Sequence, residues 1–268
     1  MTIHATALIS SHAELGSGVE VGPFAIIEDG VQVAEGCKIH ARAQLCRGTV
    51  LGPGCEIHMN AVIGHLPQDF SYKGEPIRTV LGAAVTVREN ATIHGTVGET
   101  GTRVGDKCYL MVGSHVAHNC TLGRAVLLAN GALLAGHVEV GDNAIISGNV
   151  VIHQFVRVGK LSILSGGSRF GMDVPPYVIG DGVNAITTLN SVGLRRSEGM
   201  TPADRQEIKS AYKLLYRSGM DLKEALEAIS TFKSPAVAHW LEFFKSPSRR
   251  GFCRFRPGRR LSRTEADE

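Results

Sequence analysis

Residues 104–164 read VGDKCYLMVGSHVAHNCTLGRAVLLANGALLAGHVEVGDNAIISGNVVIHQFVRVGKLSIL, and every sixth residue of this stretch is Val, Leu or Ile. Glycine often follows the aliphatic residue, as at Gly105, Gly123, Gly141 and Gly159. An amphipathic helix repeats about every 3.6 residues and a strand every two, so neither keeps a period of six. A six-residue repeat is typical of a parallel β-helix, in which each repeat buries one aliphatic residue and turns at small residues.

The same spacing runs from Ile3 to Ile63 and returns at Leu81, and two breaks interrupt it. In residues 64–80, Asp69 and Glu75 occupy the positions where buried aliphatic residues would stand. Charged side chains are costly to bury, so this stretch is predicted to be a loop excursion. A second excursion is predicted at residues 94–103, where the frame shifts by one residue. We therefore predict a β-helix over residues 1–176 that carries two loops.

The C-terminal part of the chain has helical rather than six-residue periodicity. A proline pair at 175–176 marks the exit from the repeat, and residues 177–246 are predicted to form a helical domain. Thr201, Asp221 and Ser234 are the predicted N-caps of three helices. Residues 247–268 mix arginine with Pro, Gly and Ser, and are predicted to be mostly disordered, with a surface for an acidic partner as the alternative.

Composition excludes several classes of protein. The net charge of +3 is too small to indicate a nucleic-acid partner, and no window is long and apolar enough for a membrane span. The N-terminus enters the repeat at once, without the pattern of a signal peptide. The six cysteines form no CxxC pair, which indicates buried reduced thiols. A cytoplasmic protein without integral membrane association is expected.

Polar residues of the second half gather at one predicted corner of the β-helix. Three hexapeptides make one triangular coil, so residues eighteen apart should stack at the strand spacing of about 4.8 Å. The residues that this rule brings together, here called the histidine corner, are His115, His118, Gly136, His137, His153 and Gln154. A histidine is a suitable general base near neutral pH, and a glycine N–H beside it could stabilise an oxyanion.

Two alternatives compete with catalysis at this corner. The histidines could be exposed side chains without a role. They could also bind metal, but the spacing of His115 and His118 differs from helical zinc motifs and no carboxylate or thiolate completes a ligand set. No metal ligand is therefore assigned, and a zinc shared between subunits is left as a minor alternative.

Several ordered motifs resemble one family. The motifs are His115-Val-Ala-His118-Asn-Cys-Thr-Leu-Gly, Leu134-Ala-Gly-His137-Val, Val151-Ile-His153-Gln-Phe, Asp173-Val-Pro-Pro-Tyr177, the loop elements Pro67-Gln-Asp69 and Gly74-Glu-Pro76, and Ala211-Tyr-Lys-Leu-Leu-Tyr-Arg-Ser-Gly219. To about residue 252 the chain resembles the UDP-N-acetylglucosamine O-acyltransferases. The resemblance implies a left-handed parallel β-helix with a C-terminal helical domain, assembled as a homotrimer with active sites between subunits.

The resemblance also implies an activity without a bound cofactor. Members transfer an R-3-hydroxyacyl chain from acyl carrier protein, which bears it on phosphopantetheine, to the 3-hydroxyl of UDP-N-acetylglucosamine, in the first step of lipid A biosynthesis. By position, His118 matches the general base and Gly136 the oxyanion N–H. The positions that match substrate-binding residues are His115, His137, His153, Gln154, Asp69 and Arg196. Gly166 matches the residue that limits acyl length.

Three positions depart from the family pattern. Asn119 stands where many members have aspartate after the catalytic histidine; its amide oxygen can still orient His118, but stabilises an imidazolium less. Ser71 stands where lysine is frequent, with Lys73 nearby as a replacement, and Ser197 follows Arg196 in place of a second arginine. Two alternatives stay open: N-acylation of a 3-amino UDP-sugar, and a zinc hydratase of the γ-carbonic anhydrase type.

Overall fold

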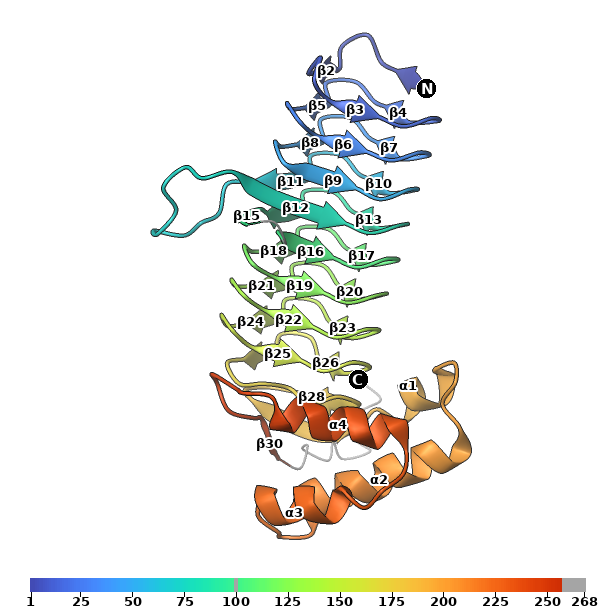
Figure 1. Cartoon of the computed structure of the whole chain (residues 1–268), viewed down its shortest axis with the longest axis vertical. Helices are drawn as coiled ribbons and strands as arrows, with labels where there is room; N and C mark the ends of the chain where they lie inside the picture. Colours follow the sequence, from blue (N-terminus) through green and yellow to red (C-terminus); the bar gives the residue numbers. More distant parts are fainter. Residues whose placement is uncertain (99–100, 257–268) are drawn as a thin grey trace, which may run out of the picture.

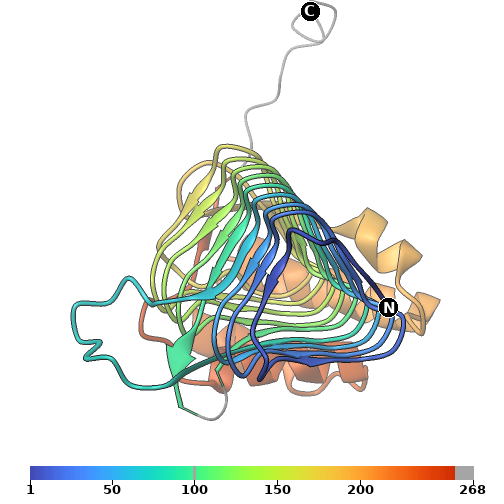
Figure 2. The same ribbon diagram turned by 90° about the horizontal axis from the view of Figure 1, so that it is seen from above.

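The computed structural model describes residues 1–98 and 101–256. Their backbone winds into a long triangular solenoid, with helices at one end and a loop that projects from one corner (Figures 1 and 2). Three sheets of mostly parallel strands form the three sides, and successive turns of the chain add strands to each sheet in rotation. The parallel β-helix predicted from the six-residue repeat is confirmed.

The strands are short, and each sheet takes about every third one. Sheet A contains β1 (Thr2–Ile3), β4 (Glu20–Val21), β7 (Lys38–Ile39), β10 (Glu56–Ile57), β13 (Thr86–Val87), β17 (Tyr109–Leu110), β20 (Leu127–Leu128), β23 (Ile145–Ile146), β26 (Ile163–Leu164), β28 (Val178–Gly180), β29 (Ala185–Leu189) and β30 (Arg254–Phe255). Sheet B contains β2 (Leu8–Ile9), β5 (Ile26–Ile27), β8 (Gln44–Leu45), β11 (Val62–His65), β14 (Thr92–His94), β18 (His115–Val116), β21 (Leu133–Leu134), β24 (Val151–Ile152) and β27 (Arg169–Phe170). Sheet C contains β3 (Glu14–Leu15), β6 (Gln32–Val33), β9 (Thr49–Leu51), β12 (Ile77–Leu81), β16 (Thr102–Val104), β19 (Thr121–Leu122), β22 (Glu139–Val140) and β25 (Arg157–Val158).

The aliphatic residues of the repeat fill the interior of the solenoid. Val116 pairs with Leu134 and Leu134 with Ile152, so the residues stack eighteen apart as predicted. All three side chains are fully buried. Burying one Val, Leu or Ile contributes about 1.5–3 kcal/mol, so these interior columns are the main source of stability.

The two excursions lengthen the chain without disturbing the stacking. Leu81 pairs with Leu51, thirty residues away instead of eighteen, so the loop between β11 and β12 adds twelve residues. Val116 pairs with Ile93, twenty-three residues away, so the second excursion adds five. Its strand β15 (Thr96–Val97) folds back antiparallel onto β12. Both excursions leave the solenoid at corners, where extra residues need not enter the core.

Sheet A extends past residue 176, so the predicted end of the solenoid is too early. Strand β28 pairs with β26, and β29 continues the sheet in antiparallel orientation. Here Leu164 faces Gly180, sixteen residues away, so the six-residue frame is lost. The ring of Phe170 fills the space beside this glycine, since a Cβ on Gly180 would lie 2.8 Å from Phe170 Cζ. The aliphatic signal is therefore absent although the strand is present.

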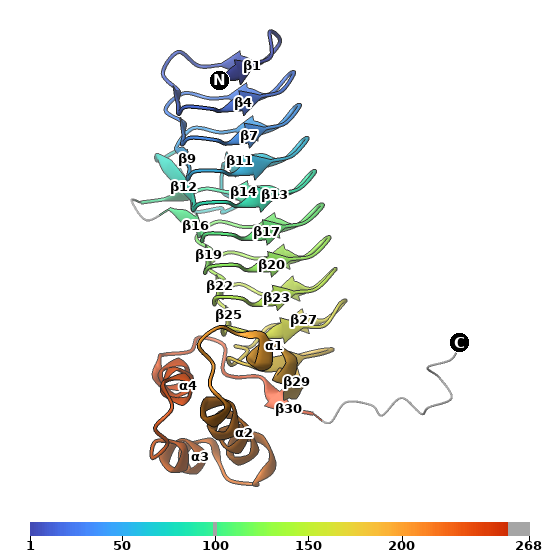
Figure 3. The same cartoon turned by 90° about the vertical axis from the view of Figure 1, so that its right-hand side faces the viewer.

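Four helices close the C-terminal end of the solenoid (Figure 3). They are α1 (Ser191–Arg196), α2 (Pro202–Arg217), α3 (Leu222–Ile229) and α4 (Pro235–Lys245). The predicted N-caps Thr201, Asp221 and Ser234 are confirmed, since each side chain accepts a backbone N–H of its helix. Helix α4 docks through Trp240, which is buried edge-on against the ring of Tyr177.

The predicted disorder of residues 247–268 is wrong for residues 247–256; residues 257–268 lie outside the described residues. The segment turns back over the last rungs, and β30 pairs with β29. Phe252 packs on Phe244 with ring centroids 4.8 Å apart, and the buried Cys253 donates its N–H to the Asp173 carbonyl over 2.8 Å. The composition of the segment is arginine-rich, but two apolar residues and backbone pairing are enough to hold it.

Candidate active site

The histidine corner lies where sheet B turns into sheet C, between β18 and β19 and in the two rungs that follow. The N–H of His137 donates to the His118 carbonyl over 3.0 Å, and the N–H of Phe155 donates to the Gly136 carbonyl over 3.1 Å. These bonds place consecutive corners directly on one another. The columns predicted from the eighteen-residue spacing are therefore confirmed.

His118 is buried and held in one orientation. Its Nδ1 lies 2.7 Å from the side-chain oxygen of Asn119, whose own N–H donates to the Thr102 hydroxyl over 3.1 Å. An amide oxygen can only accept, so Nδ1 carries the proton of the neutral ring. Nε2 is then left with a lone pair. This is the tautomer that a general base requires.

Gly136 lies directly under the imidazole of His118. A Cβ at this position would stand 2.6 Å from His118 Cε1 and 2.7 Å from Nε2, so any side chain would displace the ring. Within residues 1–98 and 101–256, the Gly136 N–H donates to no protein acceptor. A free donor therefore lies beside the basic nitrogen, which is the arrangement that an oxyanion site requires.

His137 forms the next side of the corner. Its ring meets His118 edge-on at a centroid distance of 5.4 Å and stacks on Phe155 at 4.6 Å. Burial lowers the pKa of His137, and repulsion from His118, when that ring is protonated, and from Arg249 lowers it further, against the opposite effect of Asp69. His137 is thus held neutral near neutral pH, and its ring offers a single N–H donor.

Two arginines of the returning C-terminal segment, which are not among the predicted site residues, reach the corner. Arg250 Nη2 lies 2.7 Å from His153 Nδ1, and its Nε donates to the Gln154 carbonyl over 2.9 Å. The Gln154 carbonyl also lies 3.2 Å from His153 Nδ1, but the guanidinium at 2.7 Å is closer and cannot accept. We therefore assign His153 Nδ1 as the acceptor, with the proton on Nε2, while the Gln154 carbonyl receives its hydrogen bond from Arg250. Arg249 lies over the Phe155 ring at 4.5 Å. The only sequence signal was the Phe252-Cys253 pair beside them.

A third missed residue is His94, one rung before His115. His94 lies 4.9 Å from His115 between ring centroids, and His115 Nδ1 lies 2.7 Å from the Thr92 hydroxyl. Burial, followed by repulsion from neighbouring histidines, lowers the pKa of His94 to about 4. Burial likewise lowers the pKa of His115. Counting by twenty-three across the second excursion, instead of eighteen, would have found His94.

The first loop places Asp69 at the corner. Asp69 Oδ2 lies 4.0 Å from His118 Nδ1, a distance that allows electrostatic attraction but no hydrogen bond. Its other oxygen accepts from the Ser71 N–H at 2.9 Å and the Ser71 hydroxyl at 2.8 Å, and these bonds lower the pKa of Asp69. Ser71 therefore orients the aspartate. Lys73 lies exposed on the same loop.

The remaining two predicted residues lie elsewhere on this chain. Arg196 lines a cavity of about 730 Å³ with Arg124, Asn143 and Asn190. Gly166 stands between β26 and β27, at the corner where sheet A turns into sheet B. The chain alone thus brings together His118, Gly136 and their neighbours, but neither Arg196 nor Gly166 with them.

The corner holds the groups that proton transfer requires. It offers one imidazole with a free lone pair, one free backbone N–H and further imidazole donors. Among the described residues, the side chains whose donor atoms converge as metal ligands do so at another place, His40, Glu56 and His58.

No helix in the described part of the chain is long and apolar enough to cross a membrane.

Comparison with known proteins agrees with this geometry. Residues 173–253 match the family model described as UDP-N-acetylglucosamine O-acyltransferase, domain 2, and residues 30–65 match the bacterial transferase hexapeptide model. The chain is 41% identical over 257 residues to a protein of Thermodesulfovibrio yellowstonii named acyl-(acyl-carrier-protein)–UDP-N-acetylglucosamine O-acyltransferase, covering 94% of this chain and 99% of that protein. A protein of Halorhodospira halophila with the same name is 41% identical over 256 residues, with the same coverage.

Solved structures show the same likeness. A UDP-N-acetylglucosamine acyltransferase from Bacteroides fragilis superimposes with a TM-score of 0.89 at 37% identity, covering 94% of this chain and 100% of that chain. The enzyme from Francisella novicida gives a TM-score of 0.90 at 35% identity, covering 96% and 95%. The expected left-handed β-helix with a C-terminal helical domain is thereby confirmed. The chain belongs to the UDP-N-acetylglucosamine O-acyltransferase family.

Proposed function

We propose that this chain transfers an R-3-hydroxyacyl group from acyl carrier protein to the 3-hydroxyl of UDP-N-acetylglucosamine, the first step of lipid A biosynthesis. The names of its relatives support this reaction over N-acylation of an amino sugar and over zinc-dependent hydration. One observation of the site carries the proposal: His118 presents a basic Nε2 directly above Gly136.

The proposed mechanism follows from this pair. His118 Nε2 removes the proton of the sugar hydroxyl as that oxygen attacks the thioester carbonyl. The carbonyl oxygen becomes an oxyanion, which the Gly136 N–H stabilises. The C–S bond then breaks, and the leaving thiolate of phosphopantetheine takes the proton back from the imidazolium. Asn119 orients the ring through Nδ1, and no cofactor bound to the enzyme is needed.

Substrate contacts are assigned to the side chains around this pair. His137 and His153 each offer an N–H toward the corner, and His115 and Gln154 lie on the rungs beside them. Asp69 reaches the corner from the first loop, and Lys73 lies exposed on that loop. We assign the carboxylate to hydroxyls of the sugar or acyl chain and the ammonium to phosphate. Arg250 is added as a positioning residue for His153.

A homotrimer would complete this site. Arg196, proposed to hold the nucleotide phosphates, and Gly166, proposed to limit acyl length, lie off the corner within one chain. The outward faces of the rungs at the corner also expose Leu133 and Val151, at 41% and 44%. Adjacent exposed apolar residues favour contact with another copy. We place the reaction in the cytoplasm, in keeping with six cysteines that form no disulfide.

The test is acyl transfer by purified enzyme from hydroxyacyl carrier proteins of several chain lengths to UDP-N-acetylglucosamine or its 3-amino analogue. We expect transfer to the hydroxyl, lost by at least about 100-fold in His118→Ala. The control is His12→Ala, which removes an exposed imidazole at the far end of the solenoid. Full activity of His118→Ala would refute the general base, and preference for the amino sugar would refute the acceptor. Light scattering that gives a monomer would refute the trimer.

A further inference from the structure

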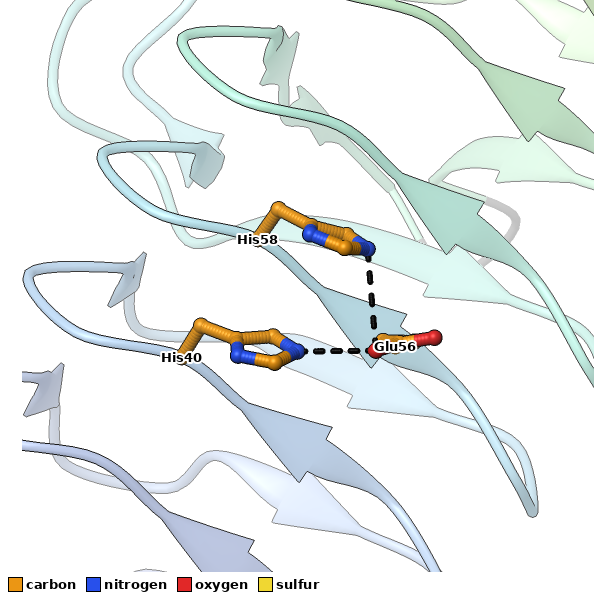
Figure 4. A group of neighbouring side chains, drawn as sticks. All are labelled: His40, Glu56 and His58. Carbon is orange, nitrogen blue, oxygen red and sulfur yellow. Dashed lines mark hydrogen bonds and ion pairs between the residues drawn. The ribbon is translucent and has the colours of Figure 1, made fainter.

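A second group of histidines lies on the N-terminal half of the solenoid, away from the histidine corner. His40 and His58 follow β7 and β10, so they stand eighteen residues apart on adjacent rungs where sheet A turns into sheet B. Their rings are stacked with centroids 4.6 Å apart and an angle of 18° between planes. Glu56, on β10, lies beside both rings, and each ring points a nitrogen at its carboxylate (Figure 4).

Both rings direct the same nitrogen at the same oxygen. His40 Nε2 lies 2.8 Å from Glu56 Oε1, and His58 Nε2 lies 3.7 Å from it. The three donor atoms all lie within 4.8 Å of one another. Ligands at about 2.0–2.2 Å from a tetrahedral Zn²⁺ stand roughly 3.4 Å apart, so small side-chain rotations would bring the three into coordination.

A further carboxylate supports His58 from behind. His58 Nδ1 lies 3.6 Å from Glu89 Oε1, and Glu89 is itself held by two hydrogen bonds of 3.0 Å from Arg88. Histidine ligands of metals usually direct their second nitrogen at a carboxylate, which fixes the tautomer and the orientation of the ring. Glu89 and His58 thus stand in the positions of the carboxylate and the histidine in such a carboxylate–histidine–metal arrangement.

Both nitrogens of His58 face carboxylate oxygens. Nε2 lies 3.7 Å from Glu56 Oε1 and Nδ1 lies 3.6 Å from Glu89 Oε1, too far for hydrogen bonds. A cation at Nε2 would fit this geometry, because Nδ1–H would then point to Glu89 while Nε2 and Glu56 share the metal.

We propose that His40, His58 and Glu56 form a Zn²⁺ site, with water in the open position. Two imidazoles and one carboxylate suit zinc better than magnesium or calcium, which prefer oxygen ligands alone. The three ligands come from two adjacent rungs, and Glu89, which supports His58, comes from a third. The metal and its supporting carboxylate would therefore connect three successive turns of the solenoid. From the sequence no metal ligand is assigned, so this proposal adds a site to that prediction.

The test uses the full-length protein after removal of metal by chelation. Calorimetry with ZnCl₂ should show one Zn²⁺ per chain, and excess Zn²⁺ should raise the melting temperature, since binding to the folded state alone stabilises it. Co²⁺ should give the visible absorption of a site with nitrogen and oxygen ligands. Glu56→Gln and His58→Ala should each weaken Zn²⁺ binding at least about tenfold, while acyl transfer is unchanged.

The matched control is His12→Ala, which disrupts a histidine–carboxylate pair that has no second imidazole. This variant should bind Zn²⁺ like the parent protein. Circular dichroism of the Glu56 variant, which keeps the size of the side chain, separates lost ligation from lost folding. Binding that is absent in the parent, or equal in all variants, would overturn the proposal. Because the calorimetric, thermal and spectroscopic measurements use no substrate, their outcome is independent of the proposed acyltransferase activity.

Discussion

Adding one methyl group at Gly136 should disable the enzyme without unfolding it. A Cβ there stands 2.6 Å from His118 Cε1 and 2.7 Å from Nε2, whereas unstrained carbon contacts begin near about 3.5 Å. The ring therefore has to retreat by about 1 Å. A displacement of this size in a reacting group costs about 100-fold in rate, equivalent to about 2.7 kcal/mol of transition-state stabilisation.

The assay compares steady-state kinetics of Gly136→Ala and the parent enzyme with hydroxyacyl carrier protein and UDP-N-acetylglucosamine. We expect kcat to fall about 100-fold, with a smaller change in KM, because the lost geometry matters in the transition state. The control is Gly148→Ala, where the nearest atom, the Asn130 carbonyl oxygen, lies at 3.4 Å. This variant should keep parental kinetics.

Two outcomes would contradict the reasoning on Gly136. Activity of Gly136→Ala within threefold of the parent would mean that the position of the His118 ring above Gly136 does not matter for catalysis. An equal loss in Gly148→Ala would mean that added methyl groups at any corner disturb the solenoid. Circular dichroism and melting curves of both variants show whether the fold is kept.

Three further predictions concern neighbouring residues. Arg250→Met removes the two guanidinium donors that contact His153 and the Gln154 carbonyl, and should lower kcat/KM about tenfold. The ¹⁵N resonances of His153 should then shift away from those of the tautomer with an unprotonated Nδ1. An unchanged spectrum would refute the positioning role. Asn119 has a φ of 61°, so glycine fits the backbone there while removing the acceptor for His118 Nδ1. In Asn119→Gly kcat should fall at least about tenfold. Asn119→Asp, which keeps an acceptor, should have most of the parental kcat. The pKa of His94 is about 4 when folded and 6.5 for the free side chain, so the unfolded chain binds more protons between these values, and stability is lost as the pH is lowered. Urea unfolding should show about 2 kcal/mol less stability at pH 5 than at pH 7, and His94→Gln should remove that part of the loss.

The fold was predictable because its signal is local and repeated. Each aliphatic residue of the repeat marks one buried position, and the eighteen-residue spacing converts sequence directly into neighbours in space. That rule alone places His118 over Gly136, as the structure confirms. The rule fails where the six-residue spacing is interrupted. It misses His94 because five extra residues precede Val104, and it misses β28 because Gly180 stands where the repeat would have an aliphatic residue.

The rest of the site could not be read from the repeat. Arg250 reaches His153 from ninety-seven residues away, through a segment whose arginines and prolines are typical of disorder. No periodic rule connects the two positions; only the packing of Phe252 and the burial of Cys253 do. The contact of Asp69 with the corner was expected from resemblance, and its distance from His118 follows from how Ser71 folds the loop.

The return of the C-terminal segment has a consequence for the timing of synthesis. The rungs of a solenoid contact only their neighbours, so they can stack one after another as the chain leaves the ribosome. The corner, however, combines Asp69 with Arg250, and β30 joins sheet A only after residue 255 has been made. A nascent chain that has stacked every rung therefore still lacks strand β30 and the contact of Arg250 with His153. Within one chain, the corner reaches its full set of contacts only after the β-helix itself is built.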